Sequence, residues 1–94
     1  MPEPNAGAVL AHAIMQYRSG DLTTVEFCAT YECLYNLEID KDSLSPVHRS
    51  IFQQLFDDVI WYSPFPEDRA RYPGYRDEIA IHLAVERAWH ALCL

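Results

Sequence analysis

The chain has 94 residues, of which fourteen are acidic and seven basic, so its formal charge is −7. This length gives room for one domain with a small core, covering residues 1–94. The negative charge disfavours direct binding to nucleic acids or anionic lipids and favours a basic partner. No apolar run approaches the ~18 residues that a membrane-spanning helix needs, and the first residues lack the pattern of a signal peptide.

The cysteines predict a reduced, cytoplasmic protein. There are three of them, an odd number, and no Cys-x-x-Cys motif is present. Cys28 and Cys33 fall on different sides of one predicted helix, so we do not expect them to pair.

The first third of the chain predicts two amphipathic helices. Asn5 can cap the first helix, and Ser19–Gly20 can end it. Thr23 and Glu26 form a capping box at the start of the second helix, which we expect to run to about Asn36. The apolar face of the first helix comprises Val9, Leu10, Ala13, Ile14 and Tyr17, and that of the second comprises Val25, Phe27, Cys28, Tyr31, Leu34 and Tyr35.

Two more helices are predicted in the rest of the chain. Residues 37–44 alternate apolar and acidic side chains too briefly for a sheet, and we interpret them as a loop. Ser45 and Pro46 form a strong helix start, and Asp77 can cap the last helix. The third helix, with its wide apolar stripe, is expected to be the most buried. That stripe comprises Ile51, Phe52, Leu55, Phe56, Val59 and Ile60, and the face of the last helix comprises Ile81, Ala84, Val85, Ala88, Trp89 and Leu92.

These elements predict an all-α protein folded as an antiparallel four-helix bundle. If the helices alternate in direction, the loop after the first helix lies at the same end as the connection between the third and fourth. Asp21 would then extend an acidic surface at that end.

Residues 61–77, called the 61–77 connection below, hold more charged and aromatic side chains than a linker requires. Pro64 and Pro66 prevent the third helix from continuing past Tyr62, and Pro73–Gly74 favours a second turn. The segment is either a solvated linker anchored by aromatic side chains or a binding surface.

Acidic residues form two clusters along the chain. Asp57, Asp58, Glu67 and Asp68 have no basic residue among them, and Glu38, Asp40 and Asp42 are balanced only by Lys41. Acidic side chains interleaved with aromatic ones favour a protein partner.

Catalytic and metal-binding patterns are weak. His82, Glu86 and His90 share a helix face at four-residue spacing, but they lie away from the apolar stripe, and no zinc-motif spacing accompanies them. Asp57 and Asp58 would point about 100 degrees apart on a helix, and no nucleophile elbow or phosphate-binding glycine loop is present. We therefore expect no catalytic residue, metal or cofactor.

The segments Trp61–Arg69 and Tyr72–Glu78 resemble those of the bacterial colicin D-type immunity proteins. Their distinctive parts are Ser-Pro-x-Pro-Glu and Pro-Gly-Tyr-x-Asp-Glu. The resemblance covers most of the chain, since the helix starts at Leu22–Phe27 and Leu44–Pro46 follow in the family's order. Phe65 stands where an acidic or polar residue is expected in the family.

The resemblance implies a cytoplasmic bacterial protein that binds a cognate nuclease toxin, typically one that cleaves transfer RNA. The toxin would belong to a bacteriocin or to a contact-dependent growth inhibition system. Acidic groups would stand in for RNA phosphates in the basic active site, in agreement with the charge of the chain. The candidate partner-binding residues are Asp57, Asp58, Glu67, Asp68, Asp77 and Glu78 as acidic groups and Phe65, Tyr72 and Tyr75 as anchors.

Two other classes of function stay open from the sequence. The chain could be a small helical adaptor or regulator that binds a protein without inhibiting a nuclease. It could also be a small catalytic or metal-dependent domain, which metal analysis would test.

Overall fold

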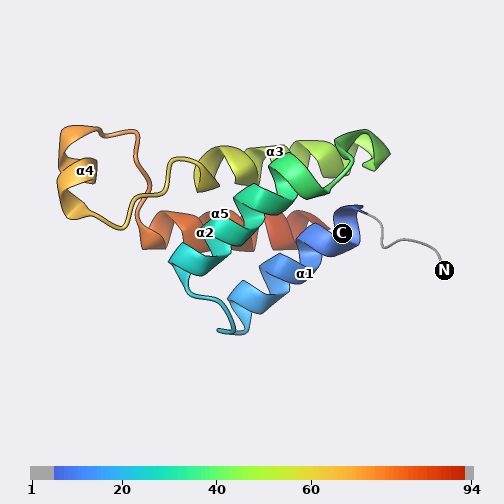
Figure 1. Cartoon of the computed structure of the whole chain (residues 1–94), viewed down its shortest axis with the longest axis horizontal. Helices are drawn as coiled ribbons and strands as arrows, with labels where there is room; N and C mark the ends of the chain where they lie inside the picture. The colour runs from blue at the N-terminus through green and yellow to red at the C-terminus, as the bar shows by residue number, and fades with distance from the viewer. Residues whose placement is uncertain (1–5, 93–94) are drawn as a thin grey trace.

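The computed structural model describes residues 6–92 and shows an all-helical chain (Figure 1). The five α-helices are α1 (Ala6–Arg18), α2 (Thr24–Cys33), α3 (Pro46–Val59), α4 (Pro66–Arg71) and α5 (Glu78–Leu92). Within this part of the chain there is no β-strand, and Tyr62 and Arg76 form a single isolated bridge. No helix in this range is both long and apolar enough to cross a membrane. The all-α prediction is confirmed.

Local signals start and end most helices as expected. Thr23 and Glu26 form the capping box of α2, Ser45 Oγ accepts the backbone N–H of His48 at 3.2 Å, and Asp77 Oδ1 accepts that of Ala80 at 2.8 Å. Gly20 has a φ of +88°, which only glycine adopts readily. The expected cap Asn5 lies outside the described residues.

The core lies between α1, α2, α3 and α5, with α1 against α2 and α5, and α3 against α2 and α5. Helix α1 contributes five buried residues and α3 only three, so the prediction that the third helix is the most buried is wrong. Ile51 and Phe56 are partly buried, and Ile60 is exposed, because the stripe is wider than the face that its neighbours cover. The buried core residues are Leu10, Ala13, Ile14, Tyr17, Phe27, Cys28, Tyr31, Tyr35, Phe52, Leu55, Val59, Ile81, Ala84, Val85 and Ala88.

Thr24 takes the buried position at the start of α2 that we assigned to Val25, which is exposed. Helix positions that are two residues apart in sequence point about 200 degrees apart, so Val25 points away from the core when Phe27 faces it. The hydroxyl of Thr24 meets that of Tyr17 at 2.9 Å and donates to Glu78 Oε1 at 3.1 Å. The starts of α2 and α5 therefore lie side by side.

The predicted loop at residues 37–44 contains helical turns. Helix α2 continues into a π-helical turn, η1 (Leu34–Glu38), and a 3-10 turn, η2 (Lys41–Ser43), follows. In the π turn the Ile39 N–H donates to Leu34 O at 3.1 Å, and both side chains pack on the core. The interpretation of 37–44 as a loop is thus corrected.

The 61–77 connection contains α4, a helix that was not predicted from the sequence. Pro66 lies in its first turn, where no backbone N–H is required. Acidic Glu67 and Asp68 lie in the first turn, while Arg69 and Arg71 lie in the last. Charges in this order interact favourably with the helix dipole and stabilise the helix. Helix α4 stands at one end of the molecule, away from the end of α5 (Figure 1).

Candidate protein-binding site

The two ends of the 61–77 connection are joined to each other by backbone hydrogen bonds. The N–H of Arg76 donates to Trp61 O at 2.7 Å, and the N–H of Ser63 donates to Arg76 O at 3.0 Å. The segment between them, including α4, is therefore a closed loop on a fixed base.

Ser63, a residue absent from our candidates, fastens α4 to this base. It is buried, its Oγ donates to Asp68 Oδ2 at 2.9 Å, and the same oxygen accepts the Phe65 N–H at 3.2 Å. Arg69 Nη1 donates to the Ser63 carbonyl at 2.7 Å. Serine hydroxyls that bond the backbone two residues on are typical of turns, so Ser63-Pro64 was the available sequence signal.

Asp58 ties the connection to two helices. Its carboxylate accepts Arg76 Nε at 3.0 Å and Arg87 Nη2 at 3.2 Å, and the side chain is only 17% exposed. Arg76 also donates to Gly74 O at 2.6 Å. Asp58 thus pairs with two cations and contributes little negative field to the solvent.

The six acidic candidates divide into an internal and an exposed group. Asp58, Asp68 and Asp77 each hold a structural contact described above. The exposed residues are Asp57, Glu67 and Glu78. Within the exposed group, Asp57 accepts Gln53 Nε2 at 3.0 Å and Glu78 accepts the Thr24 hydroxyl at 3.1 Å. Negative charge toward a partner at this end therefore comes mainly from the exposed group.

The aromatic candidates are presented outward by the same loop. Phe65 is 60% exposed and Tyr72 56% exposed, while Tyr75 is half-buried. Tyr75 makes edge contacts with Tyr72 and with Trp61, at centroid distances of 5.8 and 5.7 Å. Trp61 is itself 48% exposed, so it belongs to this aromatic cluster although it was not among our candidates.

A hollow of about 280 Å³ opens between the connection and the start of α5. Its lining combines apolar walls with charges of both signs. The lining residues are Tyr62, Pro64, Arg69, Asp77, Glu78 and Ile79.

Most cations of residues 6–92 are held by contacts within the chain. Arg18 binds Glu86 at 2.8 Å, Arg49 binds Asp42 at 3.3 Å, and Lys41 lies over the Tyr35 ring at 4.7 Å. Together with the two arginines on Asp58, four arginines are matched by three carboxylates. The excess negative charge of the chain therefore resides on carboxylates that carry no such arginine.

The possible metal-binding residues on α5, His82, Glu86 and His90, make other contacts in the structure. His82 stacks on Tyr17 at a centroid distance of 4.7 Å, and His90 Nε2 lies 3.8 Å from Glu86. The hydrogen bond from Arg18 lowers the pKa of Glu86. No group of three possible metal ligands occurs among the residues that the structure describes.

Two residues of the second acidic cluster, Asp40 and Asp42, make contacts within the chain. Asp40 Oδ1 accepts the Asp42 N–H at 3.0 Å, and Asp42 binds Arg49. The side chain of Glu38 lies outside the described parts of the structure.

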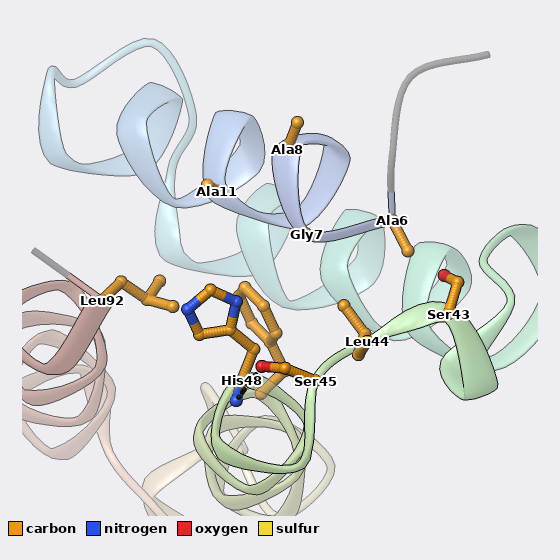
Figure 2. Close-up of a pocket in the computed structure, with 10 residues that line it drawn as sticks. Ala6, Gly7, Ala8, Ala11, Ser43, Leu44, Ser45, His48 and Leu92 are labelled. Carbon is orange, nitrogen blue, oxygen red and sulfur yellow. Dashed lines mark hydrogen bonds between the residues drawn. The ribbon is translucent and has the colours of Figure 1, made fainter. Parts of the chain in front are cut away.

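A cavity of about 450 Å³ lies away from all of these candidates, between the start of α1 and the start of α3 (Figure 2). Small α1 residues line one side, and His48 and Leu92 line another, with the His48 ring pointing toward Leu92. None of the predicted partner-binding residues lines it.

Comparisons with models of protein families, with curated proteins and with solved structures gave no match to this chain. The function is therefore inferred from the residues and geometry of the site.

Proposed function

We propose that this protein is a cytoplasmic bacterial immunity protein that binds a cognate nuclease and neutralises it. The supporting observation is the 61–77 connection, which presents exposed aromatic side chains beside exposed carboxylates from an internally hydrogen-bonded base. A surface that is already ordered loses less entropy on binding than a mobile loop does.

The partner that fits this surface is a basic nuclease, most simply one that cleaves transfer RNA. A ribonuclease needs a basic cleft to hold the phosphates of its substrate. Exposed carboxylates such as Glu67 would be attracted to that cleft, which raises the association rate, and would occupy it in place of RNA. Phe65 and Tyr72 would exclude water and supply apolar contact.

Inhibition by coverage requires neither catalysis nor a cofactor from this chain. We propose accordingly that the protein is not an enzyme and acts with one-to-one stoichiometry toward the toxin. The site residues kept in this proposal are Asp57, Glu67 and Glu78 for charge and Phe65, Tyr72 and Tyr75 for contact, with Asp58, Asp68 and Asp77 positioning them.

We also propose that α1, α2, α3 and α5 form an antiparallel four-helix bundle. The contacts of α1 with α2 and α5, and of α3 with α2 and α5, support a closed ring of helices. Tyr17, near the end of α1, stacks on His82, near the start of α5, and Ile51, in the first half of α3, lines a small hollow with Ala88, in the second half of α5. These relationships support α1 and α3 both running opposite to α5. Nuclear Overhauser contacts between these pairs would test the arrangement.

The experiment uses the toxin encoded by the neighbouring open reading frame. Purified wild-type protein should stop its nuclease activity at an equimolar ratio, and the two should co-elute as a complex. Failure of both would overturn the immunity proposal and leave the adaptor function.

Two charge reversals locate the surface. Glu67→Lys should slow association several-fold and weaken protection, whereas Glu32→Lys, the same charge change on α2, should leave protection intact. Asp68→Lys is a poorer probe because it removes the hydrogen bond from Ser63. Equal effects of the Glu67 and Glu32 variants would mean that only net charge matters.

A further inference from the structure

One arginine of this chain is held by a tryptophan and a carboxylate from the same helix. The Arg18 guanidinium carbon lies 4.8 Å from the centroid of the Trp89 ring, and Arg18 Nε lies 2.8 Å from Glu86 Oε1. Glu86 precedes Trp89 by three residues on α5. One turn of helix thus supplies both an aromatic face and a negative charge for a single guanidinium.

The end of α3 repeats this combination. Asp57 precedes Trp61 by four residues, and helix-like hydrogen bonds continue through this turn, with the Trp61 N–H donating to Asp58 O at 3.2 Å. That bond spans three residues, as in a 3-10 turn, while the bond before it, from the Ile60 N–H to Phe56 O at 3.0 Å, still spans four. Asp57 and Trp61 therefore lie about one turn apart at the end of α3. Both residues are exposed.

No cation within residues 6–92 is placed over the Trp61 ring or paired with Asp57. The two arginines that reach this end of α3, Arg76 and Arg87, are both bound to Asp58. The arrangement at Trp61 therefore offers an indole and a carboxylate without an internal arginine, and the neutral amide of Gln53 is the side chain that donates to Asp57.

The backbone and the ring of Trp61 each have a contact that limits their motion. The Trp61 backbone carbonyl accepts the Arg76 N–H at 2.7 Å, and the Tyr75 ring meets the indole edge-on, with an angle of 62° between the planes. A fixed aromatic face loses little freedom when a ligand stacks on it.

We propose that Trp61 and Asp57 form a binding site for an arginine side chain of a basic protein partner. The assignment of this arginine to a nuclease rests on the proposed function, because a nuclease cleft is rich in arginine side chains. Arginine fits better than lysine, since the planar guanidinium can stack on an indole and pair with a carboxylate at the same time. Trp61 is then the anchor that adds specificity to the charge attraction.

The first test uses a chemical probe in place of the nuclease. Tetra-arginine amide is titrated into the full chain at low ionic strength while the indole N–H signals of both tryptophans are followed by NMR. The Trp61 signal should move in a saturable manner, and the Trp89 signal, whose ring already carries Arg18, should move far less. Tetra-lysine amide, with the same charge, should cause a smaller change at Trp61.

Variants then separate stacking from charge. Affinities of the variants are taken from backbone amide shifts in the same titration, because Trp61→Ala and Trp61→Phe lack the Trp61 indole signal. Trp61→Ala and Asp57→Asn should each weaken binding of the arginine peptide about twofold to fivefold, as expected for an exposed cation–π contact or ion pair. Trp61→Phe, which keeps an aromatic ring, should fall between wild type and Trp61→Ala. Val47→Ala, an exposed apolar truncation in the first turn of α3, should bind as wild type does.

The second test measures binding to the inactive form of the cognate nuclease. Trp61→Ala should weaken the complex about tenfold to a hundredfold, mainly through faster dissociation. Unchanged binding by this variant, equal shifts of both tryptophans, or equal responses to the two peptides would overturn the arginine site. If the wild type does not inhibit the nuclease but the arginine peptide still selects Trp61, the immunity proposal fails and the arginine site stands.

Discussion

Asp58 Oδ1 accepts a hydrogen bond from Arg76 Nε at 3.0 Å, and this ion pair joins residues that are eighteen positions apart. It fixes the far end of the 61–77 connection against the last turn of α3. Arg87 uses the other carboxylate oxygen, so one acidic side chain connects α3, the connection and α5. The position of the proposed binding surface therefore depends on Asp58.

We expect Asp58→Asn to destabilise the protein by about 1 to 3 kcal/mol, since hydrogen bonds between charged groups contribute more than neutral ones. Asp57→Asn, at an exposed neighbouring position, should change the free energy of unfolding by less than about 0.5 kcal/mol. Urea unfolding of the two variants measures the difference. Equal stability would mean that the two arginine contacts contribute nothing in solution.

Leu55 tests the core assignment of α3. It is 2% exposed, and Leu55→Ala should lower the free energy of unfolding by about 2 to 5 kcal/mol because a cavity remains. The matched change Val47→Ala, on the exposed side of the same helix, should cost less than about 0.5 kcal/mol. Thermal unfolding with unchanged midpoints for both variants would contradict the orientation of α3.

The helix starts could be predicted because their signals are local. Thr23 with Glu26, Ser45 with Pro46, and Asp77 each satisfy backbone groups within three residues along the chain. Helix α4 carried the same kind of signal at Pro66, but six residues without an apolar stripe offered no periodicity to detect.

The roles of the acidic candidates could not be predicted in the same way. Asp58 and Asp57 are adjacent in sequence, yet only Asp58 reaches two arginines, one of them 29 residues away. Exposure of Trp61 likewise depends on how the connection folds back, through the hydrogen bond from the Arg76 N–H to the Trp61 carbonyl. Such contacts follow from the tertiary arrangement and leave no local pattern.

Glu26 should make the free energy of unfolding depend on pH in the acidic range. Its carboxylate accepts the Thr23 N–H at 3.0 Å, and this bond, followed by the contact with the Thr23 side chain, lowers the pKa of Glu26. A lowered folded-state pKa stabilises the protein above the unfolded value of about 4.5, and the contribution is lost as the pH falls through the folded value.

Glu26→Gln should therefore flatten the fall in stability below about pH 4.5, because glutamine keeps the capping bond without titrating. Glu26→Ala should be less stable than Glu26→Gln at neutral pH, since it removes the bond itself. Urea midpoints measured from pH 7 to pH 3 separate the two effects. A Glu26→Gln profile as steep as that of the wild type would contradict this role.

The two described cysteines should differ sharply in reactivity. Burial raises the pKa of Cys28 to about 12, with a smaller contribution from Glu32, and its side chain is 6% exposed. Cys33 is exposed and free.

At pH 8, iodoacetamide should label Cys33 rapidly, while Cys28 should react only when the chain unfolds, because alkylation requires an accessible thiolate. Peptide mass spectrometry with and without urea resolves the two sites, and Cys33→Ser removes the fast one. If Cys28 were labelled as fast as Cys33 in the native protein, the packing of α2 against the core would be looser than its contacts imply.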